Sequence, residues 1–412
     1  METADREILL REIREIINER VDYNKDITDD EMKELVMNTV FERSRQQYMS
    51  IQDKQEIIQA IFNSMRRLDV LQPIIEDKTV TEIMVNGPDN IFIEKEGKIM
   101  RLETAFESRE RLEDVIQSIV AKVNRTVNEA SPMVDARLSD GSRVSVVLPP
   151  IALNGPILTI RKFPEKPITM EQLIEFGSIT EEASEMLKAL VKAKYNIFIS
   201  GGTGSGKTTF LNALSSFIPE DERIITIEDS AELQISGIDN IVRLETRNAN
   251  TEGKGEITIR QLIKTSLRLR PERIIVGEVR GEEALDMLQA MNTGHDGSLS
   301  TGHANSTEDM LSRLETMVLS AAQMPLEAIR QQIASAIDII IHLSRIRDKS
   351  RKVMEISEVV GYINGKIRLN PLFVYEEEGE TADKRVVGSL KRTSNDLVNR
   401  YKLKMAGIDI RI

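Results

Sequence analysis

The sequence predicts an α/β protein, in which a domain built on a largely parallel sheet follows a smaller α+β domain and a helical N-terminal segment. From about residue 170 onward, apolar strand-like runs alternate with helical segments, as in parallel sheets covered by helices on both faces. One of these runs leads directly into a glycine-rich loop and then a helix. Upstream, the strand-like runs are short, separated by turn residues and accompanied by one helix, which predicts a compact α+β domain.

Residues 1–66 are predicted to be helical. Apolar residues recur at helical spacing from Ile8 to Val21. A second helix through Phe41 has a start signal at Thr28, where a capping box is flanked by an apolar staple. The segment is polar, and we expect it to be a mobile accessory or docking unit.

Residues 67–164 are predicted to form a compact α+β domain with its own core. Short strands, turns and one helix follow each other, and Asp140-Gly141 is a strong hairpin signal. The expected strands are 81–85, 91–94, 98–102, 134–138, 143–148 and 157–161.

Residues 165–375 are predicted to form the α/β domain, after a short linker marked by Pro164 and Pro167. A hairpin at Asn364-Gly365 closes this domain. Residues 376–412 begin with an acidic run, and we expect a solvated, weakly ordered tail there. The expected strands are 196–200, 223–228, 241–245, 273–277, 297–301 and 338–343.

Composition excludes several classes of protein. The net charge of −12 disfavours a nucleic-acid groove, since such grooves are usually basic. The absence of cysteine rules out disulfides, thiolate zinc sites and a cysteine nucleophile. No apolar run has the length of a membrane-spanning helix, and the N-terminus lacks a signal-peptide core. We therefore expect a cytoplasmic protein.

The strongest motif is a phosphate-binding loop, Gly201-Gly202-Thr203-Gly204-Ser205-Gly206-Lys207-Thr208. It follows a predicted buried strand and opens a predicted helix, which is the context this motif requires. In such loops the lysine reaches the β- and γ-phosphates and the hydroxyl after it can hold Mg²⁺. The predicted ATP-binding residues are Gly202, Thr203, Gly204, Ser205, Gly206, Lys207, Thr208 and Thr209.

Two further strands end in carboxylates. The run 223–229 ends in Glu228-Asp229, and the run 273–278 ends in Gly277-Glu278. A nucleotide hydrolase needs one carboxylate to position water and another to organise the metal ion. Ligands of open α/β sheets bind at strand ends, so we interpret these acids as catalytic rather than as solvated strand ends.

The chain has three histidines, and two of them flank a short predicted strand. We predict that His295 and His303 are phosphate sensors rather than metal ligands, because further ligands at zinc-motif spacing are absent. His342 lies in an apolar run, and we interpret it as structural.

In this order, the phosphate loop, Glu228-Asp229, Gly277-Glu278 and the histidine pair resemble the secretion-superfamily traffic ATPases. These are the hexameric motors of type II secretion, type IV pili and type IV secretion. Additional stretches are similar to the tight-adherence pilus branch, the CpaF type. Those stretches are Val134-Asp135-Ala136-Arg137, Asp140-Gly141-Ser142-Arg143, residues 155–162 and residues 275–282.

This resemblance implies a RecA-like ATPase domain joined to a PAS-like N-terminal domain, with ATP and Mg²⁺ between them, in a homohexamer. It implies that Glu228 acts on water and that Glu278, with Thr208, organises Mg²⁺. It also implies that N-terminal arginines reach the γ-phosphate. The site residues it adds are Arg137, Arg143, Arg161 and His303, with Arg268, Arg270 and Arg280 as second-line candidates.

The predicted function is Mg²⁺-dependent ATP hydrolysis that powers pilus assembly or protein secretion. The motor would be cytoplasmic, peripheral at the inner face of the cell membrane, and partnered by an inner-membrane platform protein rather than by nucleic acid. Three alternatives remain open. A RecA-type helicase or recombinase is disfavoured by acidic charge and few aromatics. A phosphotransferase would need an acceptor pocket and a lid, for which there is no motif. A switch without turnover is disfavoured by Glu228 and Glu278 together.

Overall fold

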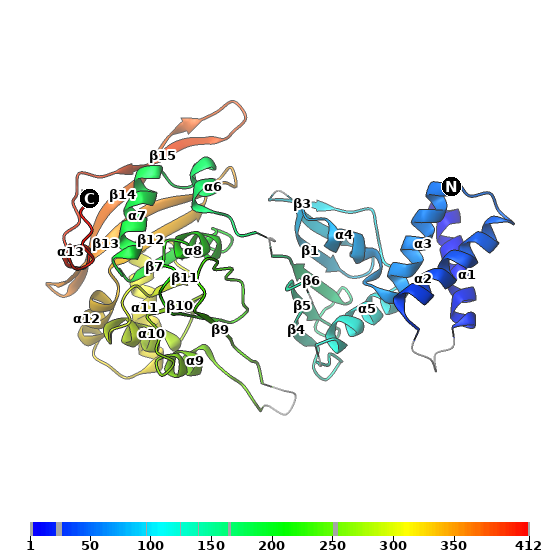
Figure 1. Cartoon of the computed structure of the whole chain (residues 1–412), viewed down its shortest axis with the longest axis horizontal. Coiled ribbons are helices and arrows are strands. Elements are labelled where there is room, and N and C mark those ends of the chain that lie inside the picture. The colour runs from blue at the N-terminus through cyan, green and yellow to red at the C-terminus, as the bar shows by residue number, and fades with distance from the viewer. Residues whose placement is uncertain are drawn as a thin grey trace. The chain divides into compact units, whose positions relative to one another are not determined.

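The computed structural model describes residues 3–21, 27–95, 97–123, 125–138, 140–163, 166–249 and 254–410. The chain divides into two compact units, Met1–Pro164 and Glu165–Ile412. Within the described ranges, each unit contains one β-sheet, with six strands in the first and nine in the second, as Figure 1 lets the reader follow. The α/β fold class predicted from the sequence is confirmed.

The first unit begins with three helices, α1 (Thr3–Arg20), α2 (Asp29–Ser44) and α3 (Ile51–Arg66). The predicted capping box is present: the Thr28 side chain accepts from the Glu31 N–H, and the Glu31 carboxylate accepts from the Thr28 N–H. Such a box satisfies donors that a helix start leaves open. The three helices bury a small apolar core of their own, which includes Ile13, Val36 and Ile61.

The rest of the first unit is an antiparallel sheet with strand order β3-β2-β1-β6-β5-β4. Helix α5 packs Leu112 and Ile116 into the same core as Ile83 and Leu158. The elements are η1 (Asp69–Leu71), α4 (Gln72–Glu76), β1 (Val80–Asn86), β2 (Ile91–Lys95), β3 (Lys98–Arg101), α5 (Arg109–Ala121), β4 (Met133–Arg137), β5 (Arg143–Val147) and β6 (Ile157–Arg161).

The second unit is built on a sheet of order β15-β14-β13-β12-β7-β11-β10-β8-β9. The run from β12 to β9 is parallel throughout, whereas β12 to β15 pair antiparallel. The strands are β7 (Ile197–Gly201), β8 (Ile224–Glu228), β9 (Ile241–Glu245), β10 (Arg273–Val276), β11 (Leu299–Gly302), β12 (Ile339–Arg345), β13 (Arg351–Ile363), β14 (Lys366–Glu380) and β15 (Val386–Arg392).

Helices cover both faces of the parallel part of this sheet (Figure 1). Along β7, Ile197 and Ile199 enter one core and Phe198 enters the other, since alternate side chains point to opposite faces. Both-face burial explains why these strands read as continuous apolar runs. The helices are α6 (Met170–Glu175), α7 (Glu181–Lys192), α8 (Lys207–Ser215), α9 (Ile259–Ser266), α10 (Glu283–Asn292), α11 (Thr307–Ala321), α12 (Leu326–Ala336) and α13 (Tyr401–Met405).

The prediction of a weakly ordered tail at 376–412 is wrong. The acidic run is the end of β14, which pairs with β15, and Lys391 of β15 contacts Glu376 and Glu378 at 2.9 and 3.0 Å. Leu390 and Leu403 are buried in the same core as Ile197 and Ile199 of β7, which we call the main core. The sequence did not predict this folded segment, because its buried leucines are widely spaced and follow neither a helical nor a strand period. Among the described residues, no helix is long and apolar enough to cross a bilayer.

Candidate nucleotide-hydrolysis site

The parallel strands bring the predicted motifs together at the carboxyl ends of the strands. Strands β7, β11, β10 and β8 are consecutive neighbours, so their carboxyl ends lie side by side. In register, Gly302 pairs with Ser200, and Val276 pairs with both Ser300 and Ile227. The phosphate loop, His303, Glu278 and Glu228 each follow or end one of these strands. Open α/β sheets bind their ligands outside the carboxyl ends of the strands.

The phosphate loop requires glycine for two separate reasons. Gly204 and Gly206 have φ angles of +71° and +92°, which side-chain-bearing residues rarely adopt. Gly201 is needed for space, since a Cβ there would lie 2.4 Å from the Leu343 carbonyl oxygen and 2.6 Å from Ser205 Oγ. Helix α8 begins directly after Gly206, so its free N–H groups face the loop.

Lys207 lies under the loop rather than in solvent. Its ammonium donates to the carbonyl oxygens of Gly201 and Gly202, both at 3.0 Å, and lies 3.3 Å from His303 Nδ1. Burial lowers the pKa of Lys207. The loop's own carbonyls thus hold this cation where the motif places phosphate, and a bound phosphate would compete for it.

Glu278 is held between a histidine and an arginine. His303 Nε2 lies 2.7 Å from Glu278 Oε1, and Arg280 Nε donates to Glu278 Oε2 at 2.8 Å. Burial, and then the Lys207 ammonium, lower the pKa of His303. A neutral imidazole with its proton on Nε2 therefore fits between the lysine and the carboxylate. The ion pairs continue from Arg280 to Asp229 Oδ2 at 3.4 Å.

Glu228 is a buried carboxylate, with 3% of its surface exposed. Its Oε1 accepts the backbone N–H groups of Glu232 and Leu233, both at 2.9 Å. Burial raises the pKa of Glu228 to about 7, against the lowering effect of those two hydrogen bonds. A general base works best when its pKa lies near the operating pH.

Gly277 explains the glycine that precedes Glu278. A Cβ at this position would lie 2.9 Å from Glu228 Cγ, closer than real Cβ contacts. The main chain at the end of β10 therefore passes directly against the Glu228 side chain. The two acidic motifs are in contact through this glycine, which sequence spacing alone did not show.

The structure separates some candidates from the site. His295 precedes β11 and His303 follows it, so the two histidines lie at opposite ends of this strand. The prediction of a paired phosphate sensor is therefore wrong for His295. Arg268 and Arg270 precede β10 and therefore lie, like His295, toward the amino ends of the strands. Arg280 follows β10 and reaches Glu278.

His342 lies on β12, and its Nδ1 is 2.9 Å from Ser200 Oγ. Burial lowers the pKa of His342. This arrangement agrees with a structural hydrogen-bonding role.

The three N-terminal candidates form one row across the sheet of the first unit. Arg137 pairs with Arg143, and Arg143 pairs with Arg161, on the adjacent strands β4, β5 and β6. Direct partners point to the same face and lie about 5 Å apart. The alternate residues Val144 and Ile160 are buried in the core, so this arginine row faces away from it. Like charges placed directly opposite are unfavourable, and Glu82 of β1, which pairs with Arg161 on its other side, places a carboxylate at one end of the row.

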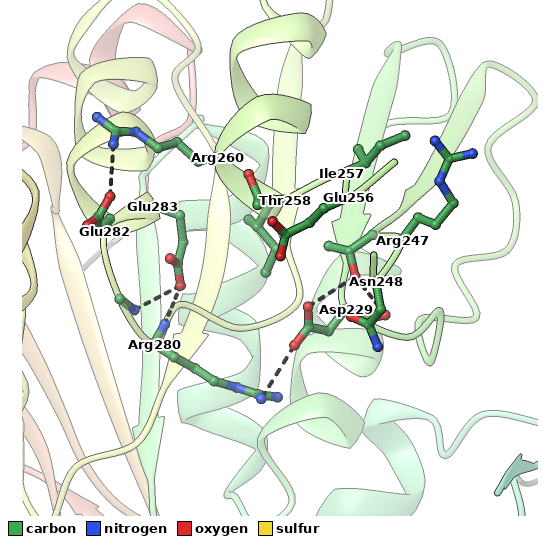
Figure 2. Close-up of a pocket in the computed structure, with 13 residues that line it drawn as sticks. Asp229, Arg247, Asn248, Glu256, Ile257, Thr258, Arg260, Arg280, Glu282 and Glu283 are labelled. Atoms are coloured by element: carbon green, nitrogen blue, oxygen red, sulfur yellow. Dashed lines mark hydrogen bonds and ion pairs between the residues drawn. The ribbon is translucent and has the colours of Figure 1, made fainter. Parts of the chain in front are cut away.

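Beside the site lies a charged cavity of about 400 Å³. Figure 2 shows Arg280 extending toward Asp229 and the Glu283 carboxylate facing the backbone at Arg280. The lining comes from the ends of β8 and β9, the start of α9 and the segment after β10. Its residues are Asp229, Thr246, Arg247, Asn248, residues 256–260 and residues 280–283.

The donors present suit Mg²⁺ rather than a protein-caged metal. No group of three or more His, Cys, Asp or Glu side chains that could hold a metal occurs among the described residues. Mg²⁺ usually keeps several waters and takes one or two protein oxygens together with phosphate oxygens. Glu278 Oε1 is buried, and its 2.7 Å contact with His303 Nε2 lacks good hydrogen-bond geometry, so this oxygen keeps acceptor capacity. Glu278 and the Thr208 hydroxyl would therefore fit such an ion.

Sequence reasoning missed Arg351 and Asn212. Arg351 Nε donates to the Gly204 carbonyl oxygen at 2.9 Å. Asn212 of α8 accepts the Gln234 N–H at 2.9 Å, which ties the segment after Glu228 to the helix of the phosphate loop. Neither residue belongs to a short motif, so only the fold could place them.

These features define a RecA-like P-loop nucleotide hydrolase, and three comparisons identify its family. The family model described as "Type II/IV secretion system protein" matches residues 65–387. The chain is 34% identical to the conjugal transfer protein TrbB of Rhizobium radiobacter, covering 76% of this chain and 94% of TrbB. It is 32% identical to the type IV secretion system protein VirB11 of Brucella suis, covering 67% of this chain and 84% of VirB11.

The solved structure of the ATPase DotB from Yersinia pseudotuberculosis is similar in fold. Its TM-score is 0.52 at 16% sequence identity, over 72% of this chain and 78% of DotB. The chain belongs to the type II/IV secretion system protein family, and it is an ATPase of that family. The traffic-ATPase family predicted from the motifs is thereby confirmed.

Proposed function

We propose that this ATPase hydrolyses Mg²⁺-bound ATP as a ring of six copies and powers pilus assembly or protein secretion. It would work at the cytoplasmic face of the inner membrane, through a platform protein embedded there. The tight-adherence branch is the proposed subtype, on the sequence stretches described above. One observation carries this proposal: the phosphate loop, Glu228, Glu278 and His303 all lie at the carboxyl ends of neighbouring parallel strands.

Glu228 is the proposed base that orients the attacking water. Its pKa of about 7 leaves a large fraction ionised at neutral pH. The segment after it is tied to α8, so the carboxylate is fixed relative to the phosphate loop. Preorganised groups of this kind contribute through position as well as basicity.

Lys207, Thr208 and the loop N–H groups would bind the phosphates, and Glu278 with Thr208 would hold Mg²⁺. When bound, that ion neutralises charge that develops on the phosphate oxygens. His303 stays neutral between Lys207 and Glu278, and its contacts respond when phosphate draws the lysine away from the loop carbonyls. This is the proposed phosphate-sensing role of His303.

The arginine row is proposed to meet the charge of the γ-phosphate. Arginine forks suit phosphate, and such a residue is worth about 10³- to 10⁵-fold in rate. Cross-strand pairing sets the three arginines side by side on adjacent strands, so that more than one fork can reach the same phosphate.

The test is ATP hydrolysis by the full chain and two variants. Lys207→Ala should lose nucleotide binding and turnover, whereas Glu228→Gln should bind ATP and lose turnover by about 10²- to 10⁴-fold. EDTA should stop turnover and Mg²⁺ should restore it. Light scattering with ATP should report six chains. Near-normal hydrolysis by Glu228→Gln, or a monomer whose specific activity is independent of protein concentration, would contradict the proposal.

A further inference from the structure

Arg351 contacts the phosphate loop from outside. Its Nε donates to the Gly204 carbonyl oxygen at 2.9 Å. Its Cδ lies 3.3 Å from the position that a Cβ on Gly206 would occupy. One arginine therefore hydrogen-bonds to Gly204 and lies beside Gly206, the two glycines that carry the positive φ angles of the loop's second half.

Sheet pairing brings this distant residue to the loop. Strand β12 is the parallel neighbour of β7, with Leu343 opposite Gly201. Strand β13 returns antiparallel to β12, with Arg351 opposite Arg345. The β12–β13 turn, residues 346–350, consequently stands beside the phosphate loop, and Arg351 is the first residue after it.

This turn and the start of β13 are braced by contacts with other elements. Arg347 donates to Glu377 of β14 through two bonds, at 2.6 and 2.7 Å. Asp348 accepts the Val386 N–H of β15 at 2.9 Å, and Lys352 donates to the Gly177 carbonyl oxygen at 2.7 Å. Two of these braces come from strands β14 and β15. A side chain on such a rigid support holds its hydrogen-bond partner at little entropic cost.

The bond to Gly204 fixes which way one peptide group faces. In a trans peptide the C=O and the following N–H point in opposite directions. Because the Gly204 carbonyl points out to Arg351, the Ser205 N–H points into the loop. It donates there to the Gly202 carbonyl oxygen at 3.3 Å, a long bond that a phosphate oxygen can replace.

We infer that Arg351 is a positioning residue for the nucleotide, which acts by holding the Gly204–Ser205 peptide with its N–H toward the phosphates. The inference rests on the proposed function, because it takes the loop as the phosphate site. It assigns to the β12–β13 turn, and through it to the C-terminal strands, a role in ATP and ADP affinity. Since the peptide serves bound substrate and transition state alike, KM should change and kcat should not.

The test measures ADP affinity by calorimetry in the presence of Mg²⁺, and ATP hydrolysis, on the full chain. Arg351→Met keeps an unbranched stem against Gly206 and removes the donor. It should weaken ADP binding and raise KM by about tenfold, the scale of a lost charge-assisted hydrogen bond, with kcat within about twofold. Arg351→Lys restores a donor and should bind ADP more tightly than Arg351→Met.

Arg330→Ala is the matched control, because Arg330 also donates to a glycine carbonyl oxygen, that of Gly365 at 3.1 Å, away from the loop. It should bind ADP as the wild type does. Wild-type ADP affinity in Arg351→Met, or a fall in kcat at unchanged KM, would overturn the inference. Wild-type ADP affinity in Lys207→Ala would instead overturn the proposed phosphate site itself.

Discussion

Replacing Glu228 with Gln should stabilise the protein while it lowers turnover by about 10²- to 10⁴-fold. Gln keeps the size of the side chain and an oxygen that can accept the Glu232 and Leu233 N–H groups, as Glu228 Oε1 does. It removes the negative charge that a site with 3% exposure disfavours. Activity and stability therefore change in opposite directions, which a general folding defect would not produce.

The magnitude follows from the pKa of Glu228, which burial raises from 4.5 to about 7. A tenfold change in an acid's dissociation constant corresponds to about 1.4 kcal/mol, so the ionised carboxylate destabilises the folded state by about 3 kcal/mol. Because the folded pKa is raised, the associated stability is fully present below pH 4.5 and is lost as the pH rises through 7. Glu228→Gln should therefore gain about 1 kcal/mol at pH 5 and about 3 kcal/mol at pH 8.

The assay is thermal unfolding of wild type and variant, without nucleotide, across this pH range. For a domain of this size, 1 kcal/mol shifts Tm by about 2–4 °C, so the variant should melt about 6–12 °C higher at pH 8. The wild-type kcat/KM should rise with pH through about 7 as the base of the free enzyme ionises. A Tm difference that does not grow between pH 5 and pH 8 would refute the reasoning, since it would show that Glu228 is ionised at little cost.

The remaining predictions concern other parts of the two units. Arg→Ala at each position of the arginine row should leave the melting temperature within a few degrees, and at least one should lower kcat by about 10³-fold or more; steady-state rates decide this. Gly277→Ala pushes a Cβ to 2.9 Å from Glu228 Cγ, so hydrolysis should fall while ADP binding by calorimetry is retained. Leu390→Ala opens a cavity in the main core and should cost about 2–5 kcal/mol in urea unfolding; a neutral result would restore the tail as a weakly ordered segment.

The sequence by itself determined the motifs whose chemistry is local. A phosphate loop is a run of consecutive residues with a required strand before it and helix after it, so Gly201 to Thr208 identify it without the fold. The same holds for the apolar strands that end in Glu228 and Glu278, since both-face burial leaves a continuous apolar run. The capping box at Thr28 is also written in neighbouring residues.

Only the tertiary structure decided which distant residues meet these motifs. Strand order puts β12 beside β7 and β13 beside β12, which brings Arg351 at the start of β13 to Gly204. No periodic pattern in the sequence predicts that pairing. Strand register aligns the arginine row. Strand direction places His295 at the amino end of β11, away from the phosphate loop. The C-terminal segment was misjudged for the same reason. Its folding depends on pairing with β13 and on isolated leucines that find a core made elsewhere in the chain, and such long-range contacts leave no local pattern.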